Sequence, residues 1–98
     1  MPTANEIIYM NEVKRLDAKA QKAGFLPLVS GEAYEAQYNG NSHVFVMMSG
    51  SKWSAWRETW QPGKERSVAI KPIVDKAPFD IALQQAHKYI AFISKKRG

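Results

Sequence analysis

The stretch SKWSAWRETWQPGKER, residues 51–66, places three tryptophans among basic residues just before a Pro-Gly turn, and its conformation decides the fold. In a helix, Trp53, Trp56 and Trp60 would share one face. In a strand, Trp56 and Trp60 point to one side and Trp53 and Arg57 to the other, because successive side chains alternate. The stretch is short, follows a Gly-Ser turn and contains Trp and Thr, which favour strands. We predict a strand followed by a hairpin loop.

Neighbouring segments supply further strands on both sides of this stretch. Residues 33–38, AYEAQY, alternate in polarity, and the Asn-Gly pair behind them is a strong hairpin signal. Residues 43–49, HVFVMMS, are apolar on both faces, as expected of a central strand. Residues 66–71, RSVAIK, form the returning strand, whereas residues 25–29, FLPLV, contain a proline and are at best an edge strand. The result is an antiparallel meander of three to four strands.

Helices are predicted at both ends of the chain. Thr3 followed by Glu6 fits a capping box, and apolar residues at helical spacing then continue to a glycine, so we place the first helix at residues 4–23. Pro78 suits the first position of a second helix. The two apolar stripes comprise Tyr9, Val13, Leu16, Ala20 and Ala23 in the first helix and Phe79, Leu83, Ala86, Ile90 and Ile93 in the second.

These elements predict an α+β fold with an N-terminal helix, a three- to four-stranded antiparallel β-meander and a C-terminal helix. Both helices are expected to pack on one face of the sheet, because each has a single apolar stripe to bury. A chain of 98 residues is long enough for one modest core. No repeat or linker divides the sequence, and we treat residues 1–98 as a single domain.

Charge is distributed unevenly along the chain. The protein carries 14 Lys and Arg against nine Asp and Glu, a formal net charge of +5. Residues 51–98 hold ten basic and four acidic side chains, a balance of +6, and they include the tryptophan stretch. Such an asymmetry favours an anionic partner, with nucleic acid the usual candidate. The alternative is that the excess charge only maintains solubility.

Several function classes have no support in the sequence. Cysteine is absent, which excludes disulfides and thiolate chemistry. The two histidines lack metal-ligand spacing, and no nucleophile elbow or glycine-rich phosphate loop is present. We therefore expect a protein that is not an enzyme and has neither a cofactor nor a metal. No apolar run is long enough to cross a membrane, and we expect a cytoplasmic protein.

The candidate site follows from the strand interpretation. Trp56 and Trp60 are expected to anchor the core, so Trp53 and Arg57 would stand on the open face of the sheet. There Trp53 would stack on a base, unless it only covers a neighbour such as Met47. The basic side chains expected to meet phosphates are Lys52, Arg57, Lys64, Arg66 and Lys71, with Lys95, Lys96 and Arg97 assisting.

The leading hypothesis is thus a small, basic, non-enzymatic accessory protein that binds nucleic acid through a tryptophan-bearing sheet face. The alternative hypothesis is a protein-binding inhibitor or adaptor module, of the kind that mobile genetic elements encode, using the same aromatic and arginine patch. That patch would comprise Tyr34, Tyr38, Met47, Trp53 and Arg57. The sequence leaves open whether the protein is a monomer or a homodimer.

Overall fold

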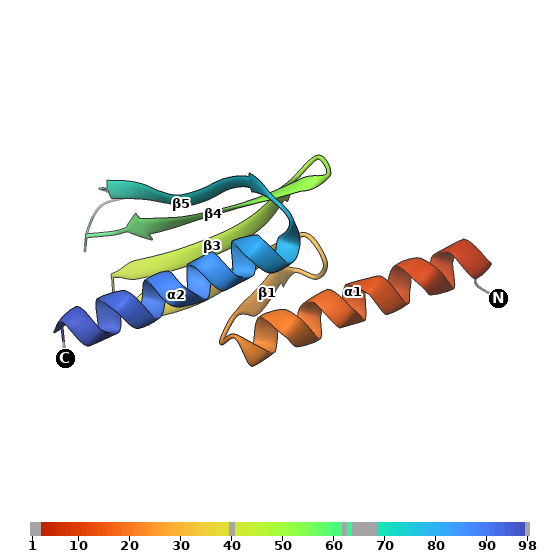
Figure 1. The fold of residues 1–98 in the computed structure, drawn as a ribbon, viewed down its shortest axis with the longest axis horizontal. Helices are drawn as coiled ribbons and strands as arrows, with labels where there is room; N and C mark the ends of the chain where they lie inside the picture. The colour runs from red at the N-terminus through yellow and green to blue at the C-terminus, as the bar shows by residue number, and fades with distance from the viewer. Residues whose placement is uncertain (1–2, 40, 62, 64–68, 98) are drawn as a thin grey trace.

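The computed structural model describes residues 3–39, 41–61, 63 and 69–97, and it shows an α+β fold (Figure 1). A helix opens the chain, an antiparallel sheet follows and a second helix closes it. The sheet has five strands rather than the three to four predicted, because the proline-containing segment does pair as an edge strand. The elements are α1 (Ala4–Lys22), β1 (Leu26–Val29), β2 (Ala33–Asn39), β3 (Ser42–Ser49), β4 (Lys52–Thr59), β5 (Ala69–Ala77) and α2 (Phe79–Arg97).

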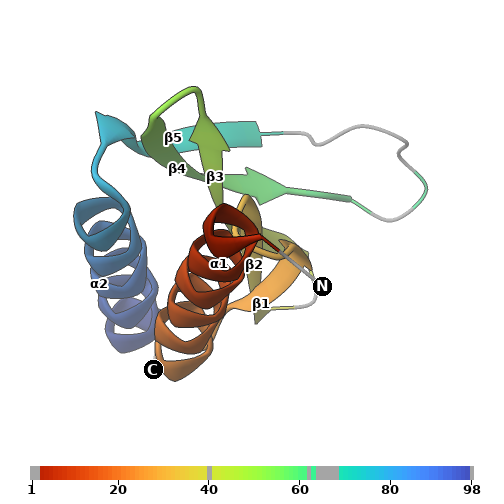
Figure 2. The ribbon, with the colours of Figure 1, turned by 90° about the vertical axis from the view of Figure 1, so that its right-hand side faces the viewer.

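The strands follow one another in the order β1-β2-β3-β4-β5, and every neighbouring pair is antiparallel. Figure 2 shows α1 and α2 side by side beneath the same face of the sheet, so the opposite face is open. The helix α1 lies under β1, while α2 lies under β3, β4 and β5. Within the part of the chain that the structure describes, neither helix is long and apolar enough to span a bilayer.

Both ends of α1 are fixed by the residues that the sequence indicated. The Thr3 hydroxyl accepts a hydrogen bond of 3.2 Å from the Glu6 backbone N–H. At the other end, the backbone N–H of Phe25 donates to the Ala20 carbonyl at 2.8 Å, across Gly24 with a φ of +89°. This is a Schellman-type end, and it buries Phe25 completely. The N-terminal half of α1 extends beyond the sheet, which leaves Tyr9 exposed despite its place in the apolar stripe.

The core lies between the helices and the inner face of the sheet, and Trp53 is part of it. Its indole is 5% exposed and packs against Phe79 of α2, with ring centroids 4.7 Å apart, and against Tyr34 of β2 at 6.0 Å. The prediction that Trp53 faces outward is therefore wrong. The alternation was correct, since Trp53, Ala55 and Arg57 share one face, but that face is the one the helices cover.

Strand register explains why Trp53 turns inward. Tyr34 pairs with Val46, and Val46 pairs with Ala55, so these three side chains lie on the same face. Tyr34 and Val46 are fully buried, and the short β3–β4 turn carries their orientation directly to β4. Trp56 consequently lies on the open face, where it is half-buried. The expectation that Trp56 anchors the helix-covered core is also wrong, and Trp60, beyond the end of β4, is only half-buried.

Candidate functional site

The residues predicted to contact a partner do not form one surface. Trp53 is in the core, and Lys52 is exposed at the start of β4 on the open face, the side to which Trp56 also points. Three of the residues occupy the last positions of α2: Lys95, Lys96 and Arg97. Two of them lie outside the described residues: Lys64 and Arg66.

The proposed protein-binding patch is not formed either. It required Trp53 beside Tyr34, and both are buried, Tyr34 completely. Met47 lies on the open face, because it pairs with Ser54, two residues from Trp56. Arg57 is on the opposite face. The side chain of Tyr38 lies outside the described part of the structure.

Arg57 and Lys71 are the two predicted residues that the fold brings together. They lie directly opposite each other on β4 and β5, on the helix-covered side of the sheet. Both approach the ring of Tyr89 in α2: the Arg57 guanidinium carbon lies 5.7 Å and the Lys71 Nζ 5.8 Å from the ring centroid. A cation within about 6 Å of an aromatic ring is attracted to its face. Tyr89 therefore holds two positive charges at one place.

The charge at this place is not balanced within the described residues. Neither Arg57 nor Lys71 forms an ion pair with a carboxylate there, and like charges directly opposite each other destabilise a sheet. The Nε of Arg57 is also buried, and it has no hydrogen-bond partner in the described part of the chain. A buried donor left unpaired costs about 1–3 kcal/mol, and more when it is charged. An anion with oxygen acceptors that contacts the exposed Lys71 ammonium would offset the repulsion between the two cations.

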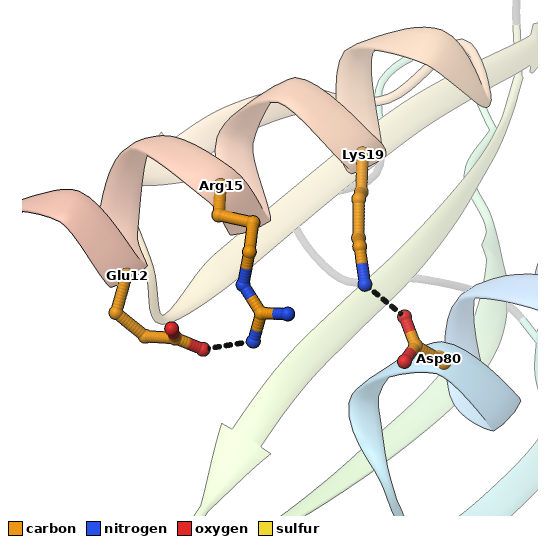
Figure 3. Close-up of polar contacts among 4 residues, drawn as sticks. All are labelled: Glu12, Arg15, Lys19 and Asp80. Atoms are coloured by element: carbon orange, nitrogen blue, oxygen red, sulfur yellow. Dashed lines mark hydrogen bonds and ion pairs between the residues drawn. The ribbon is translucent and has the colours of Figure 1, made fainter.

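The basic residues of α1 are arranged differently (Figure 3). The Arg15 guanidinium donates to the Glu12 carboxylate, and Lys19 Nζ lies 3.0 Å from an Asp80 carboxylate oxygen of α2. The hydrogen bond with Glu12, aided by its charge, raises the pKa of Arg15 above the ordinary arginine value. Two basic residues of α1 are thus compensated by carboxylates, whereas Arg57 and Lys71 have no carboxylate partner among the residues that the structure describes. This contrast selects the Arg57–Lys71–Tyr89 cluster as the candidate anion site.

The surface of α2 continues from this cluster. Phe92 follows Tyr89 by three residues, the spacing at which helical side chains are neighbours, and Phe92 is exposed. A shallow hollow on α2 is lined by Lys88, Ala91, Phe92 and Ser94. The helix then runs on to its basic end, which lies at the same end of the molecule as the beginning of β5 (Figure 1). Tyr89, Lys88 and Phe92 therefore form an aromatic and basic strip that extends along α2 from the cluster.

The open face of the sheet carries stacked aromatic rings and carboxylates, an arrangement that the sequence interpretation missed. Phe45 and Trp56 pair across β3 and β4, and their rings stack with centroids 5.7 Å apart. Trp56 Nε1 donates a 3.0 Å hydrogen bond to the Glu58 carboxylate. His43, which stacks on Phe45 at 6.2 Å, is hydrogen-bonded through Nδ1 to the Glu35 carboxylate. Two half-buried carboxylates thus flank the aromatic pair, and they oppose the binding of phosphate on this face.

Among residues 3–39, 41–61, 63 and 69–97, no group of three or more acidic or histidine side chains is placed to hold a metal ion. The His43–Glu35 pair therefore has no third ligand within that part of the chain. The sequence contained a signal for the aromatic pair. Residues 33–38 alternate between the two faces of the sheet, and the two short turns carry this alternation through β3 to β4, where it places Phe45 and Trp56 on one face.

Comparison of the chain with protein-family models, curated proteins and solved structures finds no match.

Proposed function

We propose that the protein is a non-enzymatic accessory protein that binds nucleic acid through its phosphate backbone, with Arg57 and Lys71 as the central contacts. The observation that carries this proposal is the pair of opposed cations on Tyr89, which have no carboxylate partner among the described residues. A phosphate oxygen accepts hydrogen bonds from both guanidinium and ammonium groups. Phosphate is the anion that nucleic acids present at regular intervals.

The strip along α2 supports a polymer rather than a single small anion. Lys88 is exposed and adjacent to Tyr89 in the sequence, and α2 ends in three basic residues. Contacts of this kind fix the position of the backbone and carry no base information. We therefore propose binding with little sequence preference.

The test is fluorescence anisotropy of labelled single-stranded and duplex oligonucleotides at several salt concentrations between about 50 and 200 mM. We expect Arg57→Gln and Lys71→Gln each to weaken binding about tenfold, because each removes a charged phosphate contact. Each substitution should also reduce the slope of log affinity against log salt by about one.

Two variants serve as matched controls. Arg15→Gln removes a cation that already has a carboxylate partner, and Lys52→Gln removes an exposed cation on the open face. Both should bind within about twofold of the unaltered protein, by the same charge argument. The proposal is overturned by an absence of binding at the lowest salt concentration, by affinity that does not change with salt, or by equal losses in the control and test variants.

A further inference from the structure

We infer that the open face of the sheet is a docking surface for a second protein, whose contacting segment presents apolar side chains together with arginine or lysine. This inference does not depend on nucleic-acid binding. The proposed docking surface is the face of the sheet opposite to Arg57 and Lys71. Three observations support it: the composition of that face, its charge, and a hollow at its β1 edge.

A single row of side chains crosses the whole sheet on this face. The pairs that define it are Leu26 with Glu35, Glu35 with Phe45, Phe45 with Trp56, and Trp56 with Pro72. Four of the five residues are apolar, and Leu26 at one end is 69% exposed. An apolar row with tryptophan near its centre has the composition of a binding hot spot.

The central aromatic residues are held in place before any partner arrives. Trp56 stacks on Phe45 and is tied to Glu58 through its indole N–H. Phe45 is also stacked on His43, which is tied to Glu35. Side chains fixed in this way lose little conformational entropy on association, which favours binding. The face therefore resembles a preformed binding surface more than a polar solvent-exposed one.

The charge of this face determines the chemistry of its partner. Each of Glu35 and Glu58 uses one carboxylate oxygen for a hydrogen bond within the face, and the second oxygen of each accepts no hydrogen bond from the described residues. Arginine or lysine from another protein can pair with these oxygens. A nucleic acid would be repelled by them. Two copies stacked through this face would bring four carboxylates into one interface, which disfavours self-association.

The hollow at the β1 edge provides a specific binding position for the basic residue of the partner. It measures about 280 Å³ and is lined by Leu26, Pro27, Leu28, Glu35 and Gln37. An arginine or lysine side chain has an aliphatic stem and a charged head, and it can place the first against leucine and the second against a carboxylate. Leu26 and Leu28 supply the apolar wall of the hollow and Glu35 supplies the charge. We expect this position to fix the orientation of the docked segment, with its apolar residues over Phe45 and Trp56.

The experiment is a selection of random peptides displayed on phage against the full-length protein, followed by affinity measurements on the enriched peptides. We expect enriched sequences that combine arginine or lysine with aromatic or aliphatic residues. Trp56→Ala should weaken their binding about 30-fold, as for a hot-spot residue. Glu35→Lys should weaken it at least tenfold through charge reversal, while Lys71→Gln, on the other face, should leave it unchanged.

Glu35→Lys keeps the test valid if Trp56→Ala does not fold, because Glu35 is a half-buried polar residue of the row rather than a large aromatic one. Circular dichroism and thermal unfolding verify both variants. Three results overturn the inference: a selection that yields no binding peptide, enriched peptides that are acidic, or peptides whose affinity is the same for Trp56→Ala and Glu35→Lys as for the unaltered protein. Concentration-dependent dimerisation abolished by Trp56→Ala would also overturn it, since the occupant would then be a second copy.

Discussion

The hydroxyl group of Tyr34 donates a 2.6 Å hydrogen bond to the carboxylate of Asp17, and this bond joins β2 to α1. The backbone N–H of Gly31 donates to both partners, at 2.9 Å to the Tyr34 hydroxyl and at 3.2 Å to Asp17. Tyr34 is completely buried, so its hydroxyl has no access to water. The three groups form a closed network that fixes α1 against the β1–β2 turn.

Removal of the hydroxyl by Tyr34→Phe should lower the free energy of unfolding by about 1.5–3 kcal/mol, because a buried hydrogen bond to a charged group is lost. Urea unfolding measures the change. Tyr9→Phe is the matched control, since the same atom is removed from a ring that is 62% exposed, and it should change stability by less than about 0.5 kcal/mol. Equal effects of the two substitutions would show that the network contributes nothing.

The same residue predicts a dependence of stability on alkaline pH. Burial, followed by the hydrogen bond with Asp17, raises the pKa of Tyr34 above the ordinary tyrosine value of about 10. The folded state therefore keeps the phenol proton at a pH where the unfolded chain loses it. The contribution is fully present below about pH 10 and decreases above it by up to about 1.4 kcal/mol per pH unit. The difference in unfolding free energy between the unaltered protein and Tyr34→Phe should shrink accordingly between pH 9 and 11, as measured by urea titrations; a constant difference would contradict the prediction.

Gly31 is constrained by both its conformation and its neighbour. Its φ is +79°, and a Cβ placed there would lie 2.8 Å from Cγ2 of Val13. Gly50 in the β3–β4 turn also has a positive φ, +64°, but a Cβ there would meet nothing within 4 Å. Both alanine substitutions should cost about 1–2 kcal/mol from the backbone, and Gly31→Ala about 1–3 kcal/mol more from overpacking. When Gly31→Ala is introduced into a Val13→Ala protein, the loss of stability that it causes should fall toward that of Gly50→Ala, because the clashing methyl groups of Val13 are gone. If the losses of stability caused by Val13→Ala and Gly31→Ala are strictly additive in the double variant, the steric explanation is excluded.

The positions of Trp53 and Trp56 predict unequal losses of stability. Trp53→Ala removes an indole that packs on Tyr34 and Phe79, and it should cost about 3–5 kcal/mol. Trp56→Ala removes a half-buried indole and should cost less than about half as much. Chemical denaturation of the two variants gives the comparison, and acrylamide quenching gives a second one, since Trp53 should be the protected fluorophore. A larger loss for Trp56→Ala would reverse the assignment of the two faces.

The two proposed surfaces lie on opposite sides of the sheet, and alternation along β4 separates them. Arg57 points toward the helices and Trp56 points away from them, although the two are adjacent in the sequence. A variant that loses nucleic-acid binding through Arg57 should keep its peptide affinity, and the reverse should hold for Glu35→Lys. The two proposals can thus fail independently.

Local signals account for what was predicted correctly. Thr3, Gly24 and Pro78 mark helix boundaries through backbone conformation and hydrogen bonding with near neighbours, so α1 begins and ends, and α2 begins, close to the expected residues. The sequence alone does not predict β1 as a full member of the sheet, because Pro27 weakens a strand. At the edge of the sheet, however, an unpaired backbone position needs no N–H donor, so β1 forms.

The sequence by itself determined the order of the elements, both ends of α1, the start of α2, and which side chains of β4 share a face, because all of these depend on interactions between residues a few positions apart. It also contained the orientation of Trp53, through the alternation of residues 33–38 and the short turns that carry it to β4. Only the tertiary structure decided that Arg57 and Lys71 meet at Tyr89 without a carboxylate among the described residues, and that Phe45 and Trp56 lie uncovered. Those relationships depend on where α2 packs against the sheet, and that placement is set by the shape of the whole core.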